Sequence, residues 1–144
     1  QEIRNDMLVF DGEVLEAALT VIGAPVARLF VATDGPSCDF VARLVDVHPD
    51  GRAINVSDGI LRLRPAAAGV SEIAVPMSPT ANRFAAGHRL RLEVTGSDFP
   101  VHDRNPNSGV DPLDATAADF RVATHFVFHD ARFPSRLELP VVRR

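Results

Sequence analysis

Several residue types that mark common classes of protein are missing or scarce in this sequence. It contains no lysine, tyrosine or tryptophan, and Cys38 is its single cysteine. One cysteine cannot form an intrachain disulfide, so the cysteine content gives no support for secretion. No neighbouring group would activate this thiol, and we therefore expect Cys38 to be unreactive.

Clustered positive charge and long apolar stretches are also missing. Fifteen scattered arginines and nineteen acidic residues give a formal net charge of −4, which excludes a nucleic-acid surface. No stretch reaches the roughly 18 residues of a membrane span, and no signal peptide opens the chain. We expect no membrane partner and a cytoplasmic location, with secretion as the open alternative. Because the chain begins with Gln1 instead of Met, we interpret it as a processed or excised piece of a longer protein.

The residues that are present follow the period of β-strands within one domain, residues 1–144. Residues 40–47, FVARLVDV, alternate between two faces. HPDG at 48–51 predicts a turn, and SDG at 57–59 predicts a second turn or a bulge. About eight or nine short strands without a convincing helix predict an all-β sandwich or barrel. The predicted strands cover residues 11–22, 26–32, 40–47, 52–56, 60–64, 71–77, 88–96, 120–130 and 135–141.

Catalytic motifs of serine hydrolases are not found in the sequence. G-x-S-x-G does not occur, and Ser97, although it follows Gly96, is followed by Asp-Phe-Pro and by no predicted helix. Self-contained Ser-His-Asp catalysis is therefore not expected.

Two histidines in one predicted strand raise the question of a metal site. His125 and His129 share a face, but four residues of strand separate them by about 13 Å, too far for one ion. Phe126 and Phe128 take the opposite face, and we expect them in the core. The histidines are then expected to face solvent or to form hydrogen bonds.

The long loop at 97–119 offers the best case for a metal ion in this sequence. Asp103, Asn105 and Asn107 alternate as D-x-N-x-N, with Asp114 at the twelfth position. An EF-hand requires Gly at position six and flanking helices, whereas Gly109 is at seven and strands flank the loop. A calcium loop stays an alternative, and the favoured interpretation is that Asp and Asn side chains cap the local backbone.

We therefore predict a structural loop without a catalytic residue, a metal ion or a cofactor. Its side chains are expected to form an internal network of hydrogen bonds, mainly to the backbone, that determines the path of the chain after Gly96. The residues of this predicted network are Asp98, Asp103, Arg104, Asn105 and Asn107.

Four ordered segments, taken together, resemble one known family. They are 7–34, 33–64 (TDGPSCDFVARLVDVHPDGRAINVSDGILRLR), 84–109 (FAAGHRLRLEVTGSDFPVHDRNPNSG) and 128–142 (FHDARFPSRLELPVV). They resemble the C-terminal β domain of the cocaine-esterase and X-Pro dipeptidyl-peptidase group (CocE/NonD family) of serine hydrolases. The resemblance covers essentially the whole chain in the expected order. It departs from the family at the missing Tyr and Trp, where Phe30 and Phe128 stand instead, so a hydrogen bond from a Tyr hydroxyl is lost.

This resemblance implies a jelly-roll sandwich of the galactose-binding-like type. In the family it follows an α/β-hydrolase domain with a Ser-Asp-His triad and an inserted helical cap, packs on both, helps to wall the active-site cleft and often joins in homo-oligomer contacts. The triad lies upstream of the matched region, so the resemblance implies no catalytic residue here. Two alternatives stay open: a carbohydrate-binding module, which would favour Trp and Tyr platforms, and a free-standing structural or oligomerisation domain.

Overall fold

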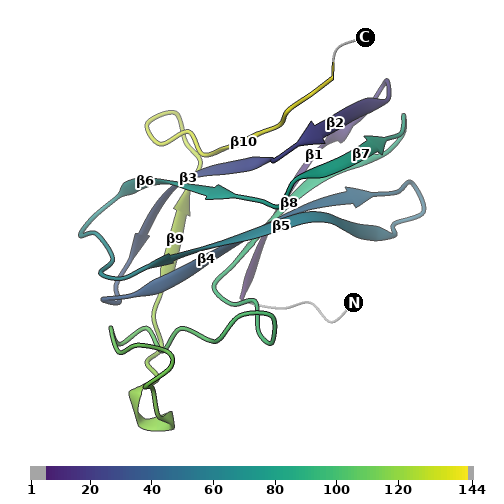
Figure 1. The fold of residues 1–144 in the computed structure, drawn as a ribbon. Helices are drawn as coiled ribbons and strands as arrows, with labels where there is room; N and C mark the ends of the chain where they lie inside the picture. The colour runs from purple at the N-terminus through teal and green to yellow at the C-terminus, as the bar shows by residue number, and fades with distance from the viewer. Residues whose placement is uncertain (1–5, 143–144) are drawn as a thin grey trace.

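The computed structural model describes residues 6–142 as two packed layers of antiparallel strands (Figure 1). Among these residues the helical structure consists of one short 3-10 turn, η1, at Ala117–Asp119. The all-β jelly-roll sandwich predicted from the sequence is confirmed. The strands are β1 (Met7–Val14), β2 (Leu19–Gly23), β3 (Val26–Thr33), β4 (Cys38–Val47), β5 (Ala53–Leu63), β6 (Ser71–Pro76), β7 (Thr80–Phe84), β8 (Arg89–Thr95), β9 (His125–Phe128) and β10 (Arg136–Glu138).

The first layer is a four-stranded sheet in the order β1-β8-β4-β5. Its central strand, β4, pairs along its length with β5 and with β8. Side chains alternate between the two faces of a strand, and here Phe40, Ala42 and Leu44 point into the sandwich. Asp39 and Arg43 therefore lie on the outer face of the same strand.

The second layer is built around β2 and β3, which follow one another across Gly23–Pro25. On one side β7 pairs with β2 and β6 pairs with β3. On the other side β9 and β10 pair with successive parts of β3, and Val141 bridges to Val21. Its buried Leu29 and Val31 meet the inner face of the first sheet. The jelly-roll crossovers follow from this pairing of strands that are distant in sequence.

The segment SDG at 57–59 is not a turn, because β5 runs through it as one strand. The bulge that the sequence allowed lies next to it: Leu44 pairs with Ser57 and Val45 with Asn55, which leaves Val56 as the extra residue. Glycine is required at position 59 for a different reason. A Cβ on Gly59 would lie 2.0 Å from the carbonyl oxygen of Pro76, so glycine permits the close approach of β6 to β5.

The predicted strand 120–130 is too long, and its faces are the reverse of those expected. The paired strand is β9 alone, since residues 120–124 belong to the loop and His129 forms just an isolated bridge with Pro134. Val127 packs against the core, whereas Phe126 is half exposed and Phe128 packs with Phe133 on the outer side. His125 is therefore on the inner face, where Thr33 forms a hydrogen bond of 2.9 Å with its Nδ1. Burial lowers the pKa of this imidazole.

Two further comparisons concern the N-terminal half and the membrane. The weakly alternating residues 11–22 are indeed β-structure, divided between β1 and β2, and β7 is a strand that the sequence did not predict. No helix within residues 6–142 is long and apolar enough to cross a bilayer.

Cys38 begins β4 and is fully buried, which gives a direct prediction about its reactivity. Burial raises the pKa of the thiol to about 11, and the neighbouring charge of Asp39 adds to the rise. At pH 8 the folded chain should therefore react with Ellman's reagent only as fast as unfolding exposes the thiol. The chain unfolded in urea should release one equivalent of thionitrobenzoate. Cys38→Ser, which removes the only thiol, is the control. Rapid stoichiometric reaction of the folded chain would contradict the prediction.

Candidate functional site

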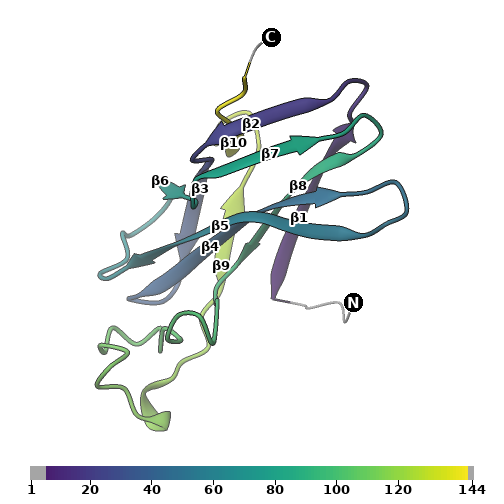
Figure 2. The ribbon, with the colours of Figure 1, turned by 45° about the vertical axis from the view of Figure 1, so that its right-hand side comes forward.

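The long connection between β8 and β9 is the main irregular feature of the described chain. It covers residues 96–124 and extends beyond one end of the sandwich (Figures 1 and 2). Within this connection, the N–H of Arg121 donates to the carbonyl of Pro106 at 2.9 Å. At its end, the N–H of Thr124 donates to Oδ1 of Asp34, which follows β3, at 2.8 Å. We call this connection the 96–124 loop.

Asn105 anchors the 96–124 loop to the first sheet. Its side chain is buried, and Oδ1 accepts hydrogen bonds from Ser37 Oγ and from the N–H of Asn107, both at 2.9 Å. Its Nδ2 donates to Asp39 Oδ1 at 2.8 Å. Ser37 Oγ in turn accepts from the N–H of Gly109 at 3.1 Å. With two bonds, Oδ1 has used both of its lone pairs and has none left for a cation.

The carboxylate that Asn105 meets is held by an arginine from the neighbouring strand. Asp39 is only 1% exposed and accepts two parallel hydrogen bonds from Arg62, at 2.8 and 2.7 Å. The same guanidinium donates to the main-chain carbonyl of Asp103 at 2.6 Å. The hydrogen bond with Asp39 raises the pKa of Arg62 above its usual value. Such bidentate pairs are strong and directional, and this one ties the loop to both β4 and β5.

Asp98 forms a second anchor, on the outer face of β4. It accepts from Arg43 at 2.5 Å and pairs with His102 Nδ1 at 3.1 Å. Its carbonyl accepts the N–H groups of Val101 and His102, which closes a turn. This anchor is four residues, or about 13 Å, along β4 from the Asp39 pair, since Asp98 holds Arg43 and Asn105 holds Asp39.

The remaining predicted residues act nearer the tip of the loop. The guanidinium of Arg104 lies over the ring of Phe120 at 4.9 Å and over that of Phe99 at 5.6 Å. Asn107 has φ of 58° and donates from Nδ2 to the carbonyl of Arg121 at 3.2 Å. The structure thus divides the five predicted residues among three contact points, and several of their partners lie outside the loop. Sequence spacing gave no signal for the partners that approach from β4, from β5 and from the turn before β4, which are Ser37, Asp39, Arg43 and Arg62.

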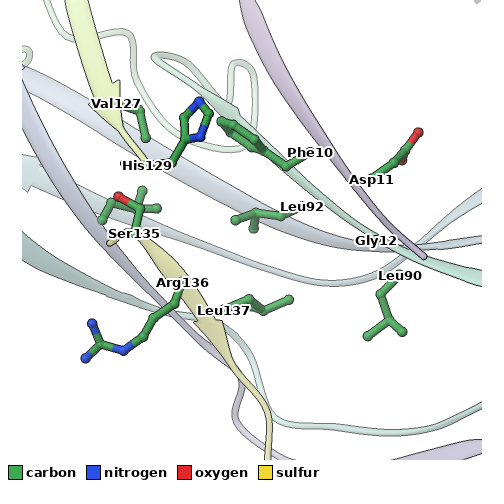
Figure 3. A pocket seen from close by; sticks show the side chains of 11 residues that line it. Phe10, Asp11, Gly12, Leu90, Leu92, Val127, His129, Ser135, Arg136 and Leu137 are labelled. Atoms are coloured by element: carbon green, nitrogen blue, oxygen red, sulfur yellow. The ribbon is translucent and has the colours of Figure 1, made fainter. Parts of the chain in front are cut away.

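A separate recess opens between the two layers (Figure 3). Its volume is about 280 Å³, and its walls are mainly apolar, with Phe10 and Leu92 from the first sheet facing Val127 and Leu137 from the second. The hydroxyl in this lining, Ser135, donates to the carbonyl of Phe128 and accepts the N–H of Phe30 at 2.8 Å. Because both bonds go to the main chain, no imidazole activates Ser135, and the recess lacks the geometry of a nucleophilic site.

Three possible metal ligands gather at the other end of β4. Asp46, His48 and His88 each offer one ligand atom, and these atoms lie within 4.8 Å of one another. Sequence reasoning considered His125 with His129 and the loop at 97–119 as metal sites, and it missed this cluster. The sequence signal for this cluster was weak. The spacing of Asp46 and His48 places them on one strand face, but His88 comes from the start of another strand.

The Asn105 anchor predicts a stability effect. Asn105→Ala removes one hydrogen-bond partner each from Asp39 and Ser37 and leaves them buried, which should lower the free energy of unfolding by about 1–3 kcal/mol in urea titrations. Asn55→Ala, which removes an exposed hydrogen bond of 2.9 Å to Asp58, is the matched control and should change stability by less than about 0.5 kcal/mol. Equal effects of the two substitutions would show that Asn105 does not anchor the loop.

The Asp98 anchor predicts a dependence on pH. Burial acts to raise the pKa of Asp98, but hydrogen bonds from Arg43 and His102 outweigh it, and the pKa falls below the ordinary 3.8. A carboxyl whose pKa is lower in the folded state stabilises the fold above its ordinary value and loses this effect as the pH falls through the folded value. The difference in unfolding free energy between the wild type and Asp98→Asn should therefore shrink between about pH 5 and 2.5. Asp114→Asn controls for removal of one loop charge, and a constant difference over this range would contradict the prediction.

Comparison with known proteins places these features in one group. Residues 1–138 match the family profile described as the X-Pro dipeptidyl-peptidase C-terminal non-catalytic domain. Among curated proteins, the chain is 38% identical over 151 residues to a cocaine esterase from Rhodococcus sp., with 98% of this chain and 26% of the esterase covered. It is 24% identical over 164 residues to a putative serine esterase from Mycobacterium bovis, with 95% of this chain and 24% of that protein covered.

Solved structures agree with the sequence matches. The chain superposes on an α-amino acid ester hydrolase with a TM-score of 0.91 and 30% identity, over 98% of this chain and 26% of that one. It superposes on an aminopeptidase from a Thaumarchaeota archaeon of marine sediment with a TM-score of 0.89 and 33% identity, over 99% and 27% of the two chains.

The chain spans about a quarter of the length of these relatives. The fold, the order of the matched segments and the match over residues 1–138 agree with one another. The chain belongs to the family of non-catalytic C-terminal domains of X-Pro dipeptidyl-peptidase and cocaine-esterase-like hydrolases.

Proposed function

We propose that this chain is the accessory domain of an α/β-hydrolase-type acyl esterase or X-Pro dipeptidyl-peptidase. It packs on the catalytic and cap domains of the same polypeptide, shapes the active-site cleft and, as the family resemblance implies, joins in homo-oligomer contacts. The observation that carries the proposal is the match over 98% of this chain to only 26% of an esterase. In such a hydrolase the nucleophile would lie outside the matched quarter, in agreement with the absence of G-x-S-x-G from this sequence.

The 96–124 loop supplies the surface that we propose for this packing. Val101, Leu113 and Val122 are each more than three-quarters exposed, and Phe99 is 64% exposed. Exposed apolar side chains gathered on one element are typical of a protein interface. In Figures 1 and 2 this element extends from one end of the sandwich, where a neighbouring domain can approach it.

Anchoring of the loop supports the same proposal. Asn105 and Asp98 attach it to β4 at two points, and Arg104 stacks on the rings of Phe99 and Phe120. A loop held in one conformation loses less conformational entropy when a partner docks on it. Asn105 and Asp98 thus face β4, while Val101, Leu113 and Val122 face outward.

The first strand begins at the same end of the sandwich as the 96–124 loop. Met7 pairs with Thr95, the last residue of β8, so the first strand begins beside the start of the loop. A recess of about 410 Å³ there is lined by Met7 and Leu8 together with Ser97 and Thr124 of the loop. A polypeptide that precedes β1 in a longer hydrolase would enter next to the proposed surface.

The first expected result concerns activity. The isolated chain should not hydrolyse a chromogenic ester such as p-nitrophenyl acetate above the rate of a Ser135→Ala variant. A chimera in which this chain replaces the matching segment of the Rhodococcus cocaine esterase should fold and hydrolyse the ester. Turnover by the isolated chain that survives inactivation by a serine-directed inhibitor would overturn the proposal.

The second expected result concerns the surface. In the chimera, Val122→Asp or Leu113→Asp places a charge in the interface and should shorten the half-life of activity at elevated temperature by about tenfold, a loss of more than 1 kcal/mol. Ile22→Asp is the control, because Ile22 is comparably apolar, about half exposed and lies opposite Ala81 in β2 of the second layer. Melting of the isolated chain should be the same for all three variants. An effect of Ile22→Asp equal to that of Val122→Asp would place the interface elsewhere.

A further inference from the structure

The cluster at the far end of β4 combines three possible ligands, one carboxylate and two imidazoles, at the ends of two neighbouring strands. Asp46 is on the inner face of β4 after Leu44, and His48 follows as the first residue beyond the strand. In the register of β4 with β8, Val47 pairs with Arg89, so His48 and His88 are the next opposing pair. Their rings lie side by side, with centroids 4.2 Å apart. The three side chains thus converge where the core ends.

Distances show that both imidazoles face the same carboxylate. His88 Nδ1 is 2.8 Å from Asp46 Oδ1, and His48 Nε2 is 4.0 Å from Asp46 Oδ2. An ion with ligand distances of about 2.0–2.2 Å in tetrahedral geometry needs about 3.3 Å between ligand atoms. The two distances end on different oxygens of Asp46, and an ion would bind one oxygen and one nitrogen from each imidazole. The three ligand atoms now lie within 4.8 Å of one another, so binding would draw them closer to that spacing.

The backbone that carries these ligands is held in place. The N–H of His48 donates to the carbonyl of Arg52 at 2.8 Å, and its carbonyl accepts from the N–H of Gly51 at 2.9 Å, which defines the β4–β5 turn. The carbonyl of His88 accepts from the N–H of Leu15 at 2.8 Å. Because the main chain is already ordered, binding of an ion would cost little further conformational entropy.

The buried carboxylate of Asp46 requires a compensating positive charge. Asp46 is 7% exposed, and a buried carboxylate is unfavourable unless it is paired with a cation or a metal ion. The imidazoles can meet this need by sharing a metal ion with the carboxylate. The side chains of His48 and His88 are 22% and 15% exposed, so an ion and one water molecule can reach them.

We propose that Asp46, His48 and His88 form a binding site for a divalent transition-metal ion of the zinc class, with water as the fourth ligand. Two imidazole nitrogens and one carboxylate oxygen suit Zn²⁺ and Co²⁺, whereas Ca²⁺ and Mg²⁺ prefer a shell of oxygens. The ion would join the β4–β5 turn to the start of β8 and so close this end of the sandwich. The site is independent of the proposed docking surface.

Binding can be tested on this 144-residue chain after treatment with a chelator. Titration with Co²⁺ should give the visible absorption of a tetrahedral ion at one equivalent, and Zn²⁺ should displace it. Zn²⁺ should also raise the unfolding temperature, because it binds the folded state. His48→Gln and His88→Gln should each weaken binding at least tenfold.

His102→Gln is the matched control. His102 also pairs with an aspartate, Asp98, at 3.1 Å, but it does not belong to the cluster. This variant should bind Co²⁺ and Zn²⁺ as the wild type does. Far-UV circular dichroism of each variant shows whether it is folded, and His48→Gln, which lies outside the strands, keeps the test valid if His88→Gln does not fold. Absence of the tetrahedral Co²⁺ spectrum in the wild type, or equal weakening by His102→Gln, would overturn the proposal.

Discussion

The buried carboxylate of Asp39 is the group on which the shape of the proposed docking surface depends. It is on the outer face of β4, where no apolar core covers it, and it is almost fully buried all the same. Arg62 neutralises its charge with two hydrogen bonds, and Asn105 contributes a third. Removal of one partner from such a group is costly, because the remaining charge stays buried. The loop can therefore leave this position only together with a large loss of stability.

This constraint explains why a segment so rich in polar residues can present an apolar surface. Asn105 and Asp98 direct their side chains to β4, so they are not available to solvent or to an ion. The apolar residues between them, such as Val101, then have no place in the sandwich and remain outside. In isolation this arrangement exposes hydrophobic surface to water, which is unfavourable. It is reasonable for a domain that is covered by another one.

Much of the fold could be predicted from the sequence, because the alternation in strands such as β4 and β8 reports directly which faces are buried. The errors arose where tertiary contacts decide. Gly59 indicated a turn, but its purpose is to let the backbone of Pro76 approach, which no local pattern reveals. The large apolar rings of Phe126 and Phe128 predicted that they face the core. His125 and Val127 face it instead, because the pairing of β9 with β3 decides which face of β9 is turned inward. Asp39 and Asp46 carried no signal of their roles, because their partners come from distant parts of the chain.

These two aspartates show how one strand can close both ends of a sandwich. Asp39 and Asp46 are seven residues apart on β4, so they lie near opposite ends and on opposite faces. The partners of Asp39 are a guanidinium and an amide, whose charge and hydrogen-bonding capacity do not change near neutral pH. The partners of Asp46 are two imidazoles, whose nitrogens are common metal ligands. Asp39 is therefore satisfied by fixed partners, whereas Asp46 lies among groups that can take up an ion at the proposed site. A change in metal supply would then alter the far end of β4 and leave the Asp39 anchor in place.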